Sequence, residues 1–297
     1  MVMSIAEQLR SHFEQRLRAA DLVRWPFPHL VLTGVFPDEW YERLLDASPF
    51  EVDGGVRYGD PSWTERLSFR HYYDHRFHHD LHPARRSLTD PLWETVGDVF
   101  SDPLWLGRLL FERFPEFFEF RFGDIDAIEA HEPGGFWGRL QTQTFLQRHE
   151  PGFQLDAHTD IPSRVATCVF NLPREAGDED AGTQLLVPND PRWRCSGNSH
   201  YPLDGFRVVG TVPYAPNTGV VFFKTRHSWH GVGPHASSAR GGRVGMQVQL
   251  YEPERGAVTD LSAPDLVVNR QLRPVSGRAR FGRRVRRVAR RVVRRGR

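Results

Sequence analysis

The sequence predicts an α+β protein, mainly β, in which helices come first and an antiparallel β sandwich or jelly roll follows. Apolar residues recur every four positions over residues 1–20, which is typical of a helix that buries one face. From about residue 118 the chain changes to short runs of alternating apolar residues, punctuated by Pro, Gly, Asn and Asp. Many short strands at this spacing favour an antiparallel sandwich or jelly roll. The 297 residues are enough to bury a sizeable core.

The helices and strands follow in order along the chain. After the helix in residues 1–20, residues 29–32 predict a short strand, and a second helix begins near Pro37-Asp38 with Asp38 as its N-cap. Residues 51–90 are polar and lack periodicity, which predicts a loop with short elements. Residues 90–116 predict a further helix, because their apolar residues fall on one face. The predicted strands lie in 118–124, 138–151, 164–173, 182–188, 206–214, 219–225 and 243–252. The long segment 188–206 between two strands is expected to contact substrate at the mouth of the β scaffold.

The formal net charge of +2 hides a strong asymmetry. Residues 266–297 contain thirteen Arg and no acidic residue, so the rest of the chain carries more acidic than basic groups. We therefore expect three parts: an N-terminal helix in residues 1–24, a main domain in 25–265 and a basic tail in 266–297. The chain lacks an apolar run of membrane-spanning length and a signal-peptide pattern, and it has two cysteines, so a cytoplasmic location is expected.

The tail predicts an amphipathic helix. Six apolar residues fall on one helical face of residues 278–297, and Arg fills the other face. Such a helix is typical of binding to an anionic membrane surface, which would make the protein peripheral to a membrane, and nucleic acid is an equally suitable partner. An acidic partner, contact with the acidic body, and a flexible end without a partner remain the alternatives.

A His-x-Asp pair, His158 and Asp160, lies between two predicted strands. Residues i and i+2 of a strand face the same way, so a loosened strand end can direct both side chains at one point. His230 follows another predicted strand and precedes a Gly-Val-Gly-Pro turn, which suits a third ligand. Two histidines and one carboxylate leave open positions on the metal and suit non-haem Fe(II). We expect His158, Asp160 and His230 to bind iron and to be the catalytic residues.

Alternative ligands exist in the sequence. His78 and Asp80 form a second His-x-Asp pair with His149 at a suitable distance, but they lack flanking strands. His227, three residues before His230, is an alternative third ligand.

Other residues have two interpretations each. The His-rich stretch 71–82 is a solvated polar loop or a second metal or substrate site. The aromatic residues Phe136, Trp137 and Trp229 line a substrate pocket or belong to the core.

Arg243 follows His230 by thirteen residues and opens a predicted strand. A buried guanidinium there could bind a carboxylate through two parallel hydrogen bonds, as the distal carboxylate of 2-oxoglutarate requires. Arg240 is the alternative, but it lies in a Ser-Ala-Arg-Gly-Gly loop rather than at the strand edge.

Four separated segments resemble, in the correct order, the prolyl-hydroxylase-like branch of the 2-oxoglutarate/Fe(II)-dependent dioxygenases. These segments are RHEPGFQLDAHTD, AGTQLLVP, GVVFFKTRHSWHGVGP and RVGMQVQLYE, and the opening PFPHLVLTGVFPDEWYERLL is similar to the start of that family's domain. The resemblance covers about residues 25–253. It implies a double-stranded β-helix (jelly roll) with packing helices, Fe(II) on His158, Asp160 and His230, and 2-oxoglutarate on Arg243.

The chain departs from the family pattern at three positions. His149 stands where the family often has Tyr, and Ala181 stands where it often has the first of two glycines. Gly245 takes the place of a Ser or Thr two residues after the arginine, so a hydroxyl partner for the cosubstrate must come from elsewhere. Thr142 and Thr144 are the candidates.

The resemblance implies a hydroxylase that oxidises a C–H bond of a small-molecule or peptide substrate and releases succinate and CO₂. The carboxylate of Asp160 favours hydroxylation or another oxidative outcome over halogenation, since related halogenases have Gly or Ala at that position. One alternative is a cupin-type metalloenzyme that does not use 2-oxoglutarate and would tolerate Arg243→Ala. The other is a non-catalytic binding protein, recruited through its tail, that would tolerate His158→Ala.

Overall fold

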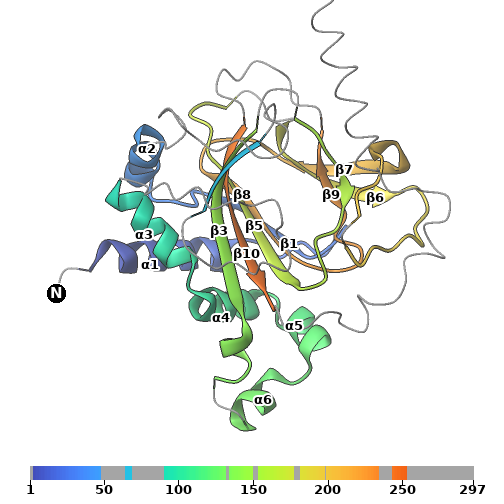
Figure 1. The fold of residues 1–297 in the computed structure, drawn as a ribbon, viewed down its shortest axis with the longest axis horizontal. Helices are drawn as coiled ribbons and strands as arrows, with labels where there is room; N and C mark the ends of the chain where they lie inside the picture. The colour runs from blue at the N-terminus through green and yellow to red at the C-terminus, as the bar shows by residue number, and fades with distance from the viewer. Residues whose placement is uncertain are drawn as a thin grey trace, which may run out of the picture.

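The computed structural model consists of two antiparallel β-sheets that enclose a common interior, with helices outside the larger sheet (Figure 1). It describes residues 3–47, 64–68, 90–131, 134–149, 153–176, 181–197, 199–233 and 243–252. The expected tail, the His-rich stretch 71–82 and Arg240 lie outside these residues.

The larger sheet has the strand order β1-β8-β5-β10-β3-β2, and the smaller sheet has the order β4-β9-β6-β7. The strands are β1 (His29–Thr33), β2 (Thr64–Ser68), β3 (Gln141–His149), β4 (Leu155–His158), β5 (Arg164–Asn171), β6 (Thr183–Pro188), β7 (Phe206–Val212), β8 (Thr218–Phe223), β9 (His230–Val232) and β10 (Arg243–Tyr251). From β3 onward the chain crosses repeatedly between the two sheets, and neighbouring strands pair antiparallel. This topology is a jelly roll and confirms the predicted fold class.

Helices cover the outer face of the larger sheet, and two of them lie at one end of it (Figure 1). They are α1 (Ile5–Ala19), α2 (Asp38–Asp46), α3 (Pro91–Phe100), α4 (Pro103–Arg113), α5 (Pro115–Phe122) and α6 (Ile125–His131). Leu9, Phe13 and Leu17 of α1 are fully buried, as their spacing predicts, and Ser4 and Glu7 form a capping box at its start. None of the helices in the described ranges combines the length and apolar character needed to span a bilayer.

The two faces of the larger sheet have different partners. Leu146, Phe170 and Met246 point outward and join the main core beneath the helices. Val220 and Phe222 point inward and pack in a small cluster with Leu185 of the smaller sheet. Because this inner apolar cluster is small, buried polar side chains occupy the rest of the interior.

The strand predicted in 118–124 is wrong, because these residues form most of α5. Pro115 occupies the first turn of this helix, where its missing N–H costs no hydrogen bond. Phe118 and Phe122 are one turn apart and buried, whereas Phe120 is 75% exposed. The alternation of Phe with polar residues therefore imitated a strand within a chain segment that packs as a helix.

Two helix boundaries also differ from the prediction. The helix expected over residues 90–116 is divided into α3 and α4, because Asp102 caps a new helix that begins at Pro103. The second helix begins at Asp38 as expected, but Pro37 is its N-cap residue and no side chain caps it.

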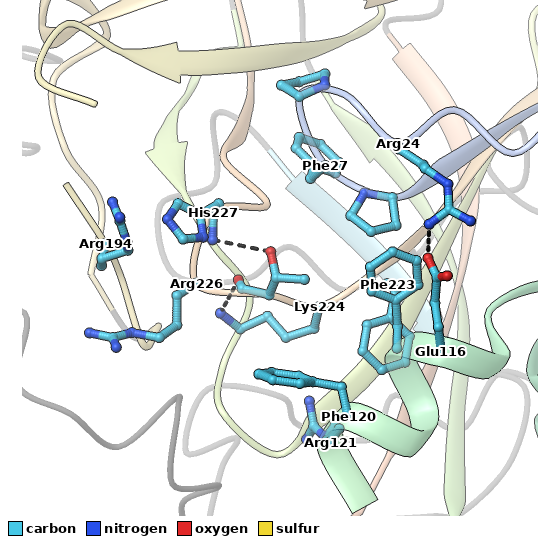
Figure 2. Close-up of a pocket in the computed structure, with 14 residues that line it drawn as sticks. Arg24, Phe27, Glu116, Phe120, Arg121, Arg194, Phe223, Lys224, Arg226 and His227 are labelled. Atoms are coloured by element: carbon cyan, nitrogen blue, oxygen red, sulfur yellow. Dashed lines mark hydrogen bonds and ion pairs between the residues drawn. The ribbon is translucent and has the colours of Figure 1, made fainter. Parts of the chain in front are cut away.

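The long segment 188–206 packs against β4 and the residues that follow it. Tyr201 forms an isolated bridge with Ala157, and the carbonyl of Cys195 accepts a hydrogen bond from Thr159. A cavity of about 710 Å³ lies nearby, between residues 24–28, α5 and the loop after β8 (Figure 2).

Substitutions of two neighbouring phenylalanines test the helical assignment of α5. We expect Phe118→Ala to lower the free energy of unfolding by about 3–5 kcal/mol, since it leaves a cavity against Phe111, Phe122 and Phe223. Phe120→Ala, on the exposed face, should change it by less than about 0.5 kcal/mol. Chemical denaturation measures both values. Equal losses in the two variants would contradict the helix, because residues i and i+2 share a face only in a strand.

Candidate metal centre

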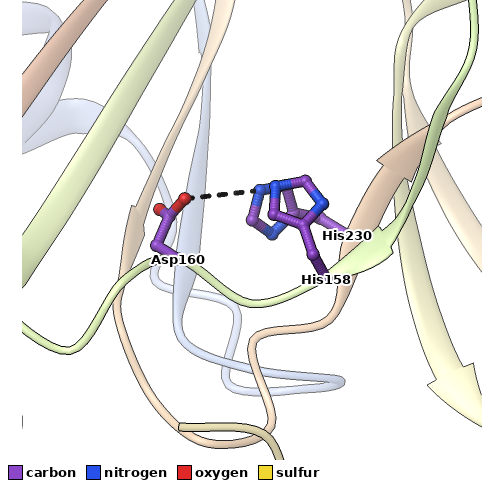
Figure 3. A group of neighbouring side chains, drawn as sticks. All are labelled: His158, Asp160 and His230. Carbon is purple, nitrogen blue, oxygen red and sulfur yellow. Dashed lines mark ion pairs between the residues drawn. The ribbon is translucent and has the colours of Figure 1, made fainter. Parts of the chain in front are cut away.

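His158, Asp160 and His230 come together in the interior of the jelly roll. Figure 3 shows the two imidazole rings one in front of the other, with the carboxylate facing them, and the ring centroids are 4.2 Å apart. One potential ligand atom from each residue lies within 4.8 Å of the other two, and Nε2 of His230 is 3.9 Å from Oδ1 of Asp160. All three side chains are buried. Among the His, Cys, Asp and Glu residues in the described part of the chain, these three lie close enough together to bind one metal ion.

Two short strands of the smaller sheet place the histidines. His158 ends β4, His230 begins β9, and the two residues are direct partners in the antiparallel register. Asp160 lies two residues beyond the end of β4, where the chain turns toward the larger sheet. The expectation that a strand end directs both members of the His-x-Asp pair at one point agrees with this geometry.

The hydrogen bonds of the two imidazoles determine which nitrogen faces the centre. Nδ1 of His158 lies 2.9 Å from the carbonyl of Asp156, and Nδ1 of His230 lies 2.9 Å from the carbonyl of Ser228. A carbonyl only accepts, so each Nδ1–H donates and each Nε2 keeps its lone pair. Metal-binding histidines commonly use a backbone carbonyl in this way.

Asp160 is held by two donors from β5. Its Oδ1 accepts a hydrogen bond of 2.6 Å from Nη1 of Arg164, and its Oδ2 accepts one of 2.6 Å from the hydroxyl of Thr167. Arg164 also donates to Gln249 at 2.8 Å and to the hydroxyl of Tyr251 at 2.9 Å, both on β10. This network connects the carboxylate to two central strands of the larger sheet and fixes its orientation.

The surroundings keep all three groups in the state that binds a cation. Burial lowers the pKa of His158 well below its ordinary value, and the rings of His230 and His200 lower it further. Burial also lowers the pKa of His230. Burial alone would raise the pKa of Asp160, but the charge of Arg164, with the neighbouring imidazoles and the hydrogen bond from Thr167, outweighs it and holds that pKa below its ordinary value. At neutral pH the centre therefore offers two neutral imidazoles and one carboxylate.

Arg243 begins β10 on the inner face of the larger sheet and is 4% exposed. Its guanidinium lies over the ring of Tyr214, with 5.7 Å to the ring centroid, and its Nη2 lies 3.5 Å from the hydroxyl of Thr183. Its Nε is buried without a hydrogen-bond partner, and among the described residues no carboxylate lies within ion-pair distance. Burial lowers the pKa of Arg243, which remains charged at neutral pH. The position suits an anionic ligand inside the jelly roll.

The hydroxyl candidates expected near this arginine were wrong. Thr142 and Thr144 point to the other face of β3 and donate to the carbonyls of Ser101 and Phe100 at the end of α3. Thr183 of β6 is the hydroxyl that approaches the guanidinium. Sequence reasoning could not find it, because β6 meets β10 only across the interior of the fold.

The three departures from the family pattern lie at buried positions. Gly245 is required by a close approach of strands, since a Cβ there would lie 2.9 Å from the carbonyl oxygen of Phe170. His149 pairs directly with Arg243 in the register, and its ring stacks on Phe153 with centroids 3.8 Å apart. Ala181 is fully buried.

The alternative third ligand and the aromatic residues considered for a substrate pocket all lie outside the ligand group. His227 is not part of the ligand group and lines the cavity beside it. Phe136 and Trp137 pack in the main core, and Trp229 packs against Tyr201 and Phe206 in a smaller cluster. These aromatic residues therefore follow the core interpretation.

Two cations near the ligands were missed by sequence reasoning. Arg164 is four residues after Asp160, a spacing that could have indicated an ion pair. Lys224, the one lysine of the chain, is buried and donates to the hydroxyl of Thr159 at 2.8 Å. Thr159 lies between His158 and Asp160 in the chain, so this hydrogen bond links Lys224 to the segment that carries two of the ligands.

Several solved structures are similar to this chain at low sequence identity. A prolyl-4-hydroxylase from Pseudomonas putida has 12% identity over 82% of this chain and 98% of that chain, with a TM-score of 0.39. A 2OG-Fe(II) oxygenase family oxidoreductase from Burkholderia pseudomallei has 13% identity over 86% and 94%, with a TM-score of 0.39. HygX from Streptomyces hygroscopicus, with nickel, 2-oxoglutarate and hygromycin B bound, has 13% identity over 79% and 90%, with a TM-score of 0.37. No protein-family model and no curated protein matches the chain. At this similarity the functional argument depends on the site of this chain itself.

Gly197 provides a test of how segment 188–206 supports the ligands. Its φ is +126°, and a Cβ there would lie 2.3 Å from the carbonyl oxygen of Asp160. We expect Gly197→Ala to displace Asp160 and to weaken Fe(II) binding by about tenfold or more, as loss of ligand support usually does. The matched control is Gly210→Ala, whose Cβ would meet Leu185 at an ordinary 3.6 Å. Anaerobic Fe(II) titration measures both, and unchanged affinity in Gly197→Ala would refute this supporting role.

Proposed function

We propose that this chain is a 2-oxoglutarate- and Fe(II)-dependent dioxygenase that hydroxylates a C–H bond of a small-molecule or peptide substrate. The observation that carries the proposal is the buried group of two neutral imidazoles and one carboxylate, His158, Asp160 and His230. A buried guanidinium on the same inner surface, that of Arg243, adds a place for the cosubstrate.

The donor set fits Fe(II). Two nitrogen ligands and one carboxylate from one side leave open positions for further ligands, which is the arrangement of non-haem Fe(II) oxygenases. Both Nε2 atoms carry free lone pairs because both Nδ1–H groups donate to backbone carbonyls. The carboxylate is oriented by Arg164 and Thr167, which limits its rotation.

The surroundings of Arg243 fit the distal carboxylate of 2-oxoglutarate. A guanidinium binds a carboxylate through two parallel hydrogen bonds, and burial strengthens each of them. Thr183 offers a hydroxyl beside it, and Tyr214 supports the flat face of the guanidinium. The proposed cosubstrate site therefore contains a charge, a hydroxyl and an aromatic support.

When bound, Fe(II) with 2-oxoglutarate and O₂ supplies the oxidation of a C–H bond, with release of succinate and CO₂. The residues of this chain position these components. His158 and His230 are fixed by their backbone hydrogen bonds, and Arg164 keeps Asp160 ionised. Phe222 contacts the ring of His230, with centroids 4.7 Å apart, and the inner apolar cluster limits the access of water.

Stepwise anaerobic titration with Fe(II) and then 2-oxoglutarate tests the proposal. We expect wild type to develop the visible charge-transfer band of the iron–keto acid chelate. His158→Ala and His230→Ala should lose it, because each removes a ligand. Arg243→Ala should need about 100-fold more 2-oxoglutarate, since it removes a buried charge pair worth a few kcal/mol.

Matched controls separate these effects from general damage. His227→Ala should keep the band, because His227 is not in the ligand group. Arg207→Ala, an exposed arginine on β7, should bind 2-oxoglutarate as wild type does. Bound iron without a band in wild type would refute the use of 2-oxoglutarate and favour a cupin-type metalloenzyme. Full biological activity of His158→Ala would instead favour a non-catalytic binding protein.

The basic tail adds a second part to the proposal. The thirteen Arg of residues 266–297 support attachment of residues 278–297 to an anionic membrane surface or to nucleic acid, in a protein proposed to be cytoplasmic. We expect the full chain, and not a chain ending at residue 265, to co-sediment with anionic vesicles or to retard duplex DNA at low salt. Equal behaviour of the two chains would contradict this role.

A further inference from the structure

The inner face of the larger sheet is polar beside the metal centre. Gln247, Gln249 and Tyr251 alternate along β10 and face inward, because the residues between them belong to the main core on the outer face. On the neighbouring strand β3, Gln143 lies directly opposite Gln249 in the register. We call these four residues the polar wall. Amide and hydroxyl groups thus occupy positions on two central strands where apolar side chains are usual.

Hydrogen bonds connect the polar wall to the metal centre. Arg164, which donates to the carboxylate of Asp160, also donates to Oε1 of Gln249 at 2.8 Å and to the hydroxyl of Tyr251 at 2.9 Å. One side chain therefore separates the wall from a proposed iron ligand. Arg243 begins β10 and Tyr251 ends it, and the two ends of such a strand are ~27 Å apart. A cosubstrate at Arg243 leaves the Tyr251 end of the wall to the substrate.

Two carboxamides of the polar wall use only one of their two hydrogen-bonding groups. Oε1 of Gln247 accepts a hydrogen bond of 2.8 Å from Nε2 of Gln249, and Oε1 of Gln143 lies 3.0 Å from the hydroxyl of Tyr251. In the described part of the chain, Gln143 and Gln247 form no other hydrogen bond. Both side chains are half-buried, so their amide N–H groups are accessible to a ligand inside the jelly roll. Gln249 is buried and uses both of its groups within the wall.

The charges beside the polar wall compensate each other. The guanidinium of Arg164 and the carboxylate of Asp160 are paired at 2.6 Å, and the four residues of the wall are neutral. The wall therefore offers N–H donors without a net charge, which suits the oxygen atoms of a neutral ligand. An apolar ligand would remove these amide groups from water without replacing their hydrogen bonds, which is costly.

We propose that the substrate is a neutral, polyhydroxylated small molecule, such as a glycoside, whose oxygen atoms accept hydrogen bonds from Gln143 and Gln247. The two residues are diagonal neighbours across β3 and β10, about 7–8 Å apart, so one molecule with several oxygen atoms can contact both. A hydroxyl can accept from an amide and turn its own hydrogen elsewhere. A peptide also presents N–H groups, which would compete for acceptors that the wall already uses. This inference rests on the proposed oxygenase function and specifies its substrate class.

Calorimetric titration of the full chain with sucrose, raffinose and maltotriose tests this substrate class, with and without Fe(II) and 2-oxoglutarate under anaerobic conditions. We expect at least one of the three sugars to bind at one saturable site per chain. N-acetyl-trialanine amide, a neutral peptide, and 1-hexanol, an apolar alcohol, should not bind comparably. The double variant Gln143→Leu/Gln247→Leu should weaken sugar binding by about tenfold or more, because both accessible amide groups are lost.

Two further measurements make the result specific. Gln8→Leu changes an exposed glutamine on α1 that donates to the carbonyl of Met3, and it should bind the sugar as wild type does. Gln143→Leu should keep the charge-transfer band of the iron–keto acid chelate, since Gln143 contacts none of the proposed iron ligands. Sugar binding without this band in wild type would refute the oxygenase function and not the sugar site. A band without binding of any of the three sugars, tighter binding of the peptide, or unchanged sugar binding in the double variant would overturn the substrate class.

Discussion

The buried ion pair between Asp160 and Arg164 is the interaction on which the centre depends. The two side chains are 4% and 11% exposed, so removing them from water costs several kcal/mol for each charge. This cost is offset by further hydrogen bonds: Thr167 donates to the carboxylate, and the guanidinium donates to Gln249 and Tyr251. The pair also joins the end of β4 in the smaller sheet to β5 in the larger sheet. A metal-binding carboxylate is thereby held at a fixed position between the two sheets.

The jelly roll can contain such a polar network because its main apolar core lies elsewhere. The helices take up the outer face of the larger sheet, where Phe13, Phe100 and Phe170 pack with ring centroids 4.9–5.6 Å apart. The inner face then needs only a small apolar cluster, and polar residues remain at both of its ends. One end holds the three proposed ligands, and the other holds Arg243. The separation of core and interior thus produces space for a metal and a cosubstrate.

Residues outside the two sheets also contact the chain segment that carries His158 and Asp160. Segment 188–206 lies against the backbone of Asp160 at Gly197, and His200 from the same segment stacks on His158 with ring centroids 4.4 Å apart. Lys224 donates both to Thr159 and to the carbonyl of Cys195 in the same segment. The ligand segment is therefore held by one hydrogen-bonded group that joins it to segment 188–206 and to the end of β8.

The sequence alone determined that helices precede a β region, that this region is a jelly roll, and which residues are candidate ligands, because these depend on local periodicity and on short spacings such as His158 to Asp160. It misassigned α5, since alternating Phe and polar residues have the same pattern as a strand and only packing against Phe223 selects the helix. The tertiary structure decided the partners of each candidate: Arg164 and Thr167 for Asp160, and Thr183 and Tyr214 for Arg243. These contacts join residues on different strands, and a single sequence does not specify which strands face each other across the interior.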